Sequence, residues 1–235
     1  MQLQELLDHL GTEILQDRPA IVSGGSGNLW SDTVLIRYLN QAQQLFARRT
    51  YCLLDATTTA ATQITLVAAT GVYALHKSVL KVLSVRLSDS TVDLYAGSRN
   101  LFQPVVVDTF AQTNTPGRPS MWAPDEEYRK LRVFPAPDTA SAALTLRLRV
   151  VRGPVADLTL NALTAEPEIP EEYHLDLCDW AAYRALSQQE VDGEAVAAAK
   201  GFKDSFMETI RVARRGAQIL TDAPTTYQFG GWAND

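Results

Sequence analysis

The period of the hydrophobic residues changes along this chain of 235 residues, and that change limits the folds it can adopt. Residues 2–16 carry leucine and isoleucine at positions i, i+3, i+4, i+7 and i+11, which is the pattern of an amphipathic helix. Residues 143–152 instead alternate, with Leu144, Leu146 and Leu148 on one side, which is the pattern of a half-buried strand. The chain must therefore combine helices with a sheet, because each needs another element to cover its apolar face.

Helical patterns occupy both ends of the chain. After the first helix, Ser31 or Asp32 is expected to cap a second one that finishes near residue 49. Pro170 followed by two glutamates indicates the start of a third helix, since proline and acidic residues favour the first turn. A fourth helix is expected over 194–215, with Gly216 as its stop signal.

The region between the helical ends has the character of a β protein. Short apolar runs are broken by glycine, proline, asparagine and aspartate from about residue 51 to residue 152. We expect strands at 63–68, 80–87, 91–95, 104–109, 120–123, 130–134 and 143–152.

These patterns predict an α+β fold: a bundle of about four helices with a central all-β insertion and an extended C-terminal tail. The expected division is 1–50 and 154–216 for the two halves of the bundle, 51–153 for the insertion and 217–235 for the tail. The two helical halves are expected to pack together, because neither can bury its apolar face alone. Within the bundle, the expected core anchors are Tyr173, Leu177, Trp180, Phe202 and Phe206.

Composition excludes several classes of protein. Hydrophobic residues make up 46% and charged residues 20%, which is an ordinary globular balance. The net charge of −6 argues against a protein that coats nucleic acid through bulk positive charge. No apolar run approaches the about 20 residues of a membrane span, and the first ten residues lack the features of a signal peptide. The two cysteines, Cys52 and Cys178, are expected to be reduced, as suits synthesis in the cytoplasm.

The sequence carries little that resembles a catalytic site. His9, His76 and His174 have no second histidine or cysteine at metal-ligand spacing, and we expect His9 and His174 on solvated helix faces. The glycine run at 23–27 lacks the lysine that a phosphate-binding loop requires. The acidic pair Glu171-Glu172 suits a helix N-terminus better than acid/base catalysis. We therefore expect no enzyme, no metal and no cofactor.

Two features point to contact with partners. The last nine positions hold three aromatic residues, which is unusual for a disordered end and indicates a segment that orders either against a partner or against the protein's own core. The expected binding residues of this tail are Ile219, Leu220, Tyr227, Phe229 and Trp232. Arg147, Arg149 and Arg152 form a basic strip that is either a solvated sheet face or a contact for an acidic partner or nucleic acid.

Several short segments follow one another in a recognisable order. A tryptophan and an aspartate precede a helix of the form LIRYLNQAQ, and an IPEEYHLDL segment with AAYRAL comes near the end. The segments are Leu35–Gln43, Gly71–Leu75, Val79–Val85, Gly117–Trp122, Leu131–Asp138 and Ile169–Leu186. Taken in this order, they resemble the head-to-tail adaptor proteins of tailed bacteriophages, also called connector or head-completion proteins.

The resemblance implies a structural protein of the virion neck, at the head–tail interface. Such a protein binds the portal ring, forms a dodecameric ring with its own copies, extends the DNA channel and docks a tail or nozzle component. It implies that double-stranded DNA passes through without sequence-specific binding, that no membrane is involved, and that the C-terminal tail grips the portal. The alternatives are another neck ring protein, namely a stopper or a tail terminator, and an enzyme from outside phages.

Overall fold

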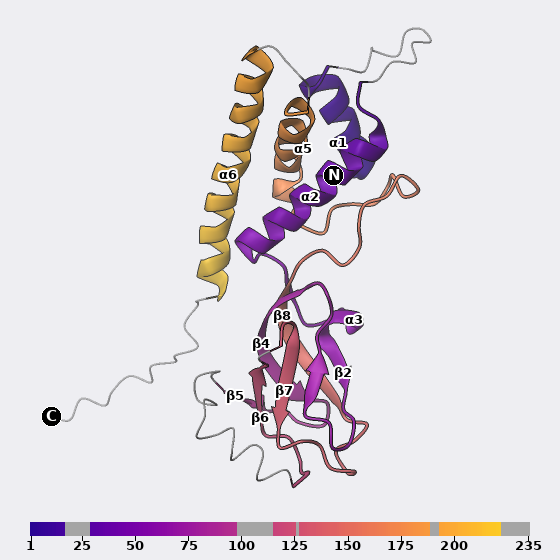
Figure 1. Ribbon diagram of the computed structural model, residues 1–235, viewed down its shortest axis with the longest axis vertical. Helices are drawn as coiled ribbons and strands as arrows, with labels where there is room; N and C mark the ends of the chain where they lie inside the picture. Colours follow the sequence, from indigo (N-terminus) through magenta and orange to yellow (C-terminus); the bar gives the residue numbers. More distant parts are fainter. Residues whose placement is uncertain (17–28, 98–114, 126, 189–192, 222–235) are drawn as a thin grey trace, which may run out of the picture. The chain divides into compact units, whose positions relative to one another are not determined.

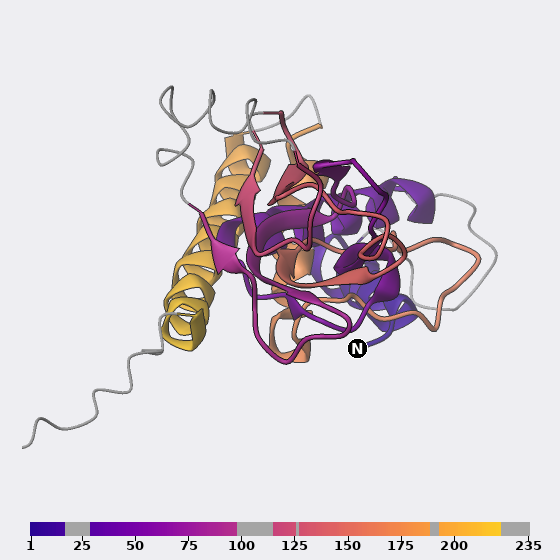
Figure 2. The ribbon, with the colours of Figure 1, turned by 90° about the horizontal axis from the view of Figure 1, so that it is seen from below.

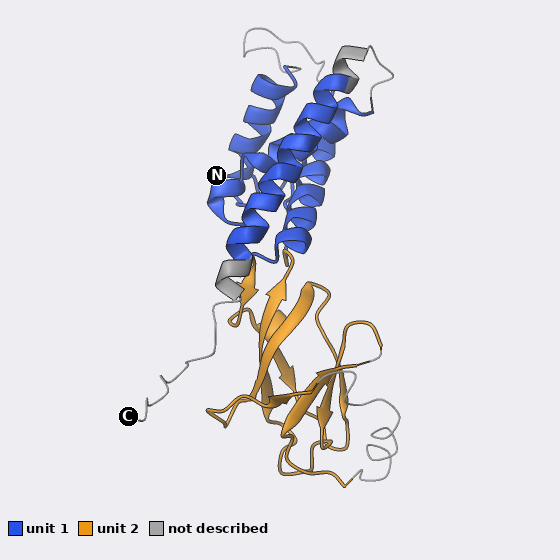
Figure 3. Cartoon of the chain, turned by 90° about the vertical axis from the view of Figure 1, so that its left-hand side faces the viewer, with its two compact units in different colours: residues 1–52, 156–235 blue, residues 53–155 orange. Residues whose placement is uncertain are grey.

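The computed structural model describes residues 1–16, 29–97, 115–125, 127–188 and 193–221. The chain divides into two compact units, which Figure 3 colours separately. Unit 1 comprises residues 1–52 and 156–235, and unit 2 comprises residues 53–155.

Unit 1 is helical. In Figures 1 and 2, helix α6 runs unbroken beside α5, and α2, α5 and α6 pack pairwise against one another. The elements of the unit are α1 (Leu3–Asp8), the π-helix η1 (His9–Ile14), α2 (Asp32–Thr50), the 3₁₀ helix η3 (Glu171–Tyr173), α5 (Asp176–Leu186) and α6 (Gly193–Thr221).

Helix α2 shows how local sequence sets the ends of these elements. Ser31 is extended at its N-cap position, and Asp32 places negative charge in the first turn. The last turn carries Arg48 and Arg49, which complement the negative end of the helix dipole. The helix ends at Thr50, because the next residue, Tyr51, has a left-handed φ of 58° that cannot continue it.

The core of unit 1 is filled by side chains from all of its longer elements. Phe46 of α2 lies at its centre, with ring centroids 4.9 Å from Tyr173 and 6.3 Å from Phe206. Full burial of one such ring contributes roughly 1.5–3 kcal/mol. The largest fully buried side chains of this core are Tyr38, Phe46, Phe206, Leu3, Leu6, Leu10, Leu35 and Leu39.

Unit 2 contains two four-stranded sheets and the short helix α3 (Thr59–Thr62). The first sheet has β8 (Thr145–Arg152) at its centre, paired with β1 (Leu54–Asp55), β2 (Gln63–Thr65) and β4 (Val79–Leu87). The second has the order β3 (Val72–Ala74), β7 (Lys130–Phe134), β6 (Met121–Pro124) and β5 (Tyr95–Ala96). Only the β5–β6 pair is parallel among the pairs in the described residues.

The two sheets of unit 2 share one core. Strand β8 alternates as its sequence predicts: Leu146, Leu148 and Val150 are buried, and Arg147 and Arg149 are exposed. The buried leucine and valine side chains pack in the same cluster as residues from the second sheet, which include Tyr73, Trp122, Leu131 and Val133.

The chain is mixed α+β, but the expectation of a four-helix bundle with one central all-β insertion is wrong. The apolar pattern over 2–16 forms a helical segment from Leu3 to Ile14 that changes from α to π geometry at His9. In unit 1 the three longer helices α2, α5 and α6 pack together. A further short α-helix, α3, lies in unit 2. The strands are spread over two sheets. Strand β8 is central in the first, and β7 is an inner strand of the second.

Two local expectations also differ from the structure. Helix α6 passes through Gly216 and ends at Thr221, so Gly216 is not a stop and the tail is not extended from residue 217. Strands β1 and β3 were not expected, because runs of two and three residues are too short to show alternation. The expected strand at 104–109 lies outside the described residues.

Candidate functional site

The histidines are held by neighbouring groups of the fold. His9 Nδ1 lies 2.9 Å from Glu13 Oε2, and His76 Nδ1 lies 2.8 Å from Ser78 Oγ. The expectation that His174 is solvated is wrong: its side chain is buried, and its Nε2 lies 2.9 Å from the carbonyl oxygen of Ile169. Among the described residues, no three His, Cys, Asp or Glu side chains come close enough together to hold a metal ion. The glycine run at 23–27 lies outside those residues.

The carboxylates with shifted pKa values have structural partners. Burial alone would raise the pKa of Asp55, but hydrogen bonds from Thr58, Thr57 and Arg152 hold it well below its usual value of 3.8. Burial raises the pKa of Asp176, which accepts a hydrogen bond from Thr209 at 3.1 Å. These hydrogen bonds tie neighbouring segments of the fold together.

Both cysteines are free thiols with suppressed reactivity. Burial, followed by the charges of Asp179 and Asp176, raises the pKa of Cys178 to about 12. Burial also raises the pKa of Cys52. Because the thiolate is the reactive form, neither side chain is suited to nucleophilic catalysis at neutral pH.

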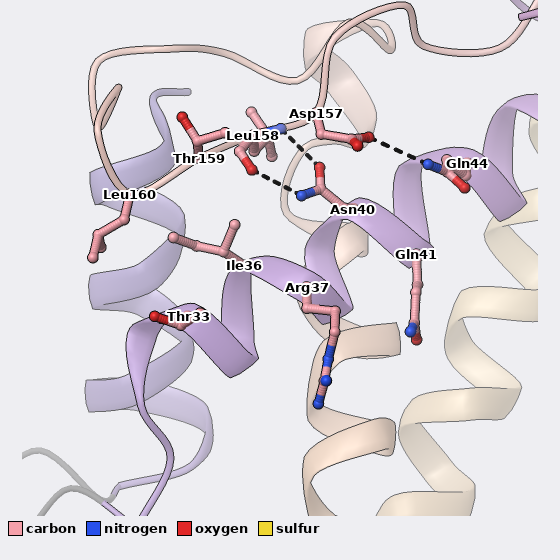
Figure 4. Close-up of a pocket in the computed structure, with 10 residues that line it drawn as sticks. All are labelled: Thr33, Ile36, Arg37, Asn40, Gln41, Gln44, Asp157, Leu158, Thr159 and Leu160. Atoms are coloured by element: carbon pink, nitrogen blue, oxygen red, sulfur yellow. Dashed lines mark hydrogen bonds between the residues drawn. The ribbon is translucent and has the colours of Figure 1, made fainter.

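An open hollow of about 440 Å³ lies between helix α2 and the segment 157–160 of unit 1 (Figure 4). The helix contributes residues between Thr33 and Gln44, and the segment contributes the opposite wall. The lining residues are Thr33, Ile36, Arg37, Asn40, Gln41, Gln44, Asp157, Leu158, Thr159 and Leu160.

Asn40 fixes the wall of this hollow. Its Nδ2 donates to the carbonyl oxygen of Leu158 at 2.8 Å, and its Oδ1 accepts from the Leu158 amide at 2.8 Å. Gln43 Nε2 also donates to that Oδ1, and Gln44 donates to Asp157 at 3.3 Å. The Asn40 amide thus satisfies both backbone groups of Leu158, as the neighbouring strand does for a residue in a sheet.

The rest of the hollow is open to a partner. Arg37 makes no ion pair within the described part of the chain, and its guanidinium lies 5.6 Å from the centre of the Tyr38 ring. Gln41 and Thr33 are exposed, and Leu160 is 48% exposed. This part of the lining combines a guanidinium, an amide and a partly exposed leucine, and arginine is enriched at protein interfaces. Thr33 has no base beside it among the residues that line the hollow, so this lining offers docking groups and no activated nucleophile.

Sequence reasoning did not find this hollow. Asn40 and Leu158 are separated by 118 positions in the sequence, and only the fold brings them together. The available signal was the exposed polar stripe of α2, with Arg37, Gln41 and Gln44 at helical spacing. Such a stripe is also the ordinary solvated face of an amphipathic helix.

The residues expected as core anchors lie in unit 1. Leu177 and Phe206 are fully buried, whereas Tyr173, Trp180 and Phe202 are partly buried against the same core. The Trp180 ring lies 5.4 Å from that of Phe206 and 5.2 Å from that of Tyr183, centre to centre.

The expected tail residues are described only in part. Ile219 and Leu220 belong to the last turn of helix α6, although their side chains are not described. The aromatic residues Tyr227, Phe229 and Trp232 lie outside the described residues. Their role in binding stays a prediction.

The expected basic strip of β8 divides into two parts. Arg152 is mostly buried, and its Nε lies 2.5 Å from Oδ2 of Asp55. Arg147 and Arg149 are exposed on the outer face of the sheet. Arg152 is therefore structural, while the other two arginines remain accessible to a partner.

The chain is thus a mixed α+β protein whose candidate site is the open hollow on α2. No helix within the described ranges combines the length and the apolar character that a membrane crossing requires. The chain belongs to the SU10 adaptor protein family, a phage head-to-tail adaptor family whose model matches residues 1–226. This match confirms the resemblance that the sequence showed. A comparison with curated proteins finds no match.

Proposed function

We propose that this protein is a structural head-to-tail adaptor that binds the portal ring in the virion neck, extends the DNA channel and docks a tail or nozzle component. The observation that carries the proposal is the family match, which spans both compact units. The open hollow on α2 supports it, because docking groups without a catalytic constellation suit a protein that joins others.

In this role several copies form a ring, which we propose to be dodecameric, and double-stranded DNA passes through without sequence-specific binding. The net charge of −6 supports this part of the proposal. DNA must slide during packaging and ejection, and a wall with many phosphate contacts would hold it in place. A ring of acidic subunits would therefore resist adhesion to the DNA.

We further propose that the C-terminal tail grips the portal. The supporting observation is its composition, with Tyr227, Phe229 and Trp232 among the last nine residues. Large aromatic side chains dominate the binding energy of many interfaces. Removing residues 222–235, which begin after the end of α6, tests this role without cutting a helix.

The alternatives are a stopper or tail terminator and an enzyme from outside phages. The family match favours the adaptor over each of them. A stopper or terminator would bind the next ring of the neck and not the portal, so the choice of partner separates these roles.

The experiment mixes the purified full chain with purified portal rings from the same phage and follows cosedimentation. We expect the full chain to saturate the portal at a fixed ratio, and the chain that lacks 222–235 to keep its melting temperature and lose binding. A full chain that fails to bind the portal would exclude the adaptor role. A truncated chain that binds as tightly as the full chain would exclude the tail as the grip.

A further inference from the structure

The two compact units carry opposite net charge. Residues 53–155 contain 11 Lys and Arg against 8 Asp and Glu, whereas residues 1–52 and 156–235 contain 10 against 19. The formal net charges are therefore +3 and −9. With this separation of charge, the basic unit of one molecule can attract the acidic unit of another.

Four of the 11 basic residues of unit 2 lie on the outer face of the first sheet, which we call the basic sheet face. In the register of the sheet, Arg86 of β4 lies directly opposite Arg147 of β8, and Ser84 lies opposite Arg149. All of its basic residues are exposed. The basic sheet face comprises Lys81, Arg86, Arg147 and Arg149.

This arrangement is not balanced within the fold. Arg86 pairs with Asp93 at 2.7 Å. Lys81, Arg147 and Arg149 make no ion pair within the described part of the chain. Like charges directly opposite on a sheet are destabilising, so a free face of this kind works against folding. An anionic surface that covers it would remove that repulsion.

The negative charge of unit 1 includes a group of glutamates that we call the acidic edge. The amide of Leu3 donates to the carbonyl oxygen of Ala165 at 2.8 Å, which joins the start of α1 to the segment that leads into η3. Glu166 and Glu172 are exposed and make no ion pair within the described ranges, and Glu171 is 3.4 Å from the amino group of Met1. The acidic edge comprises Glu5, Glu166, Glu171 and Glu172.

We propose that the basic sheet face of one copy binds the acidic edge of a second copy. The inference rests on the proposed function, in which several copies assemble side by side. Because the two surfaces differ, the contact is head-to-tail, and each copy uses both of its surfaces to bind two neighbours. Each copy supplies one exposed acidic edge for each basic sheet face, whereas the net charge of −6 opposes binding to nucleic acid.

The test measures self-association of the full chain by sedimentation velocity at high protein concentration and low salt, without portal. We expect wild-type association to weaken as salt is added. The variants Arg147→Glu/Arg149→Glu and Glu171→Arg/Glu172→Arg should each weaken it roughly tenfold or more, because each opposes like charges at the contact. The variant that combines all four substitutions should associate again, since the charges are exchanged and not lost.

The matched control is Lys77→Glu/Arg118→Glu, which changes the net charge of unit 2 by the same amount at exposed positions outside the basic sheet face. It should associate nearly as the wild type does. If a charge reversal impairs folding, Arg147→Gln/Arg149→Gln removes the same charges more gently and should weaken association to a smaller extent.

Three results would overturn the inference. One is a wild type that stays monomeric at every concentration, and another is a fourfold variant that does not recover association. The third is a basic-face variant that loses binding to duplex DNA while its self-association is unchanged, which would assign this face to nucleic acid. Portal binding is measured separately, so a chain that binds the portal but not its own copies overturns this contact and leaves the adaptor role standing.

Discussion

Replacing Asp55 with alanine tests the account of how unit 2 is held together. Its carboxylate accepts hydrogen bonds from the amides of Thr57 and Thr58 at 2.8 and 3.0 Å, and from the Thr57 hydroxyl at 3.2 Å. It also pairs with Arg152 Nε at 2.5 Å, and the two side chains are only 5% and 14% exposed. Asp55→Ala therefore leaves a mostly buried guanidinium without its carboxylate and two amides without their acceptor.

The expected cost is about 3–5 kcal/mol at neutral pH, which is the range for breaking a buried pair by removing one partner. Asp93→Ala is the control, because its pair with Arg86 is exposed and should contribute less than about 1 kcal/mol. Hydrogen exchange of the full chain separates the units: protection should fall in peptides of β4 and β8, and stay unchanged in peptides of α2 and α5.

The pH dependence of this cost has a definite sign. The pKa of Asp55 is lowered in the folded protein, so its contribution is present above the usual value of 3.8 and is lost as the pH falls through the lower folded value. The stability difference between the wild type and Asp55→Ala should therefore shrink as the pH falls from about 3.8 toward the lower folded pKa. A cost no larger than that of the control, or one that is independent of pH in acid, would refute the reasoning.

Five further substitutions test unit 1, each by thermal or denaturant unfolding. Gly216→Ala should stabilise the protein by about 0.4–1 kcal/mol, as should Gly201→Ala, because both lie in α6 with open space around an added methyl group; a loss at Gly216 alone would show that the helix stops there. Phe206→Ala should cost about 3–5 kcal/mol, and Trp180→Ala should cost less because it is only partly buried; equal losses would contradict that difference. Asn40→Ala should cost about 1–3 kcal/mol, because two backbone groups lose their partner; an unchanged melt would show that the hollow needs no clamp.

Regular patterns over many residues predicted their elements well. Helix α2 begins at Asp32, where the capping residues indicated, and β8 alternates from Leu146 to Val150. Each pattern extends over five residues or more, so chance matches are few. The family could also be predicted from the sequence, because the resemblance depended on the order of many short segments and not on any one of them.

Features decided by tertiary contacts were not predictable. Strand β3 has three residues and is placed by its pairing with β7, and the Tyr73 hydroxyl donates to the carbonyl oxygen of Val67. Helix α6 continues through Gly216, since a glycine lowers helix stability by only about 1 kcal/mol and does not by itself end a helix. The hollow on α2 depends on Asn40 meeting Leu158, a contact that has no signature in sequence.

An image of the virion neck by electron cryomicroscopy tests the central claim most directly. The account predicts a ring of density against the portal, outside the head, into which unit 1 and unit 2 can each be fitted as separate bodies in every copy. Labelling the chain with a bound antibody fragment should place added density on that same ring. Label found on the tail tip or the head surface, or an absence of the chain from purified virions, would contradict the assignment of this protein as the adaptor between head and tail.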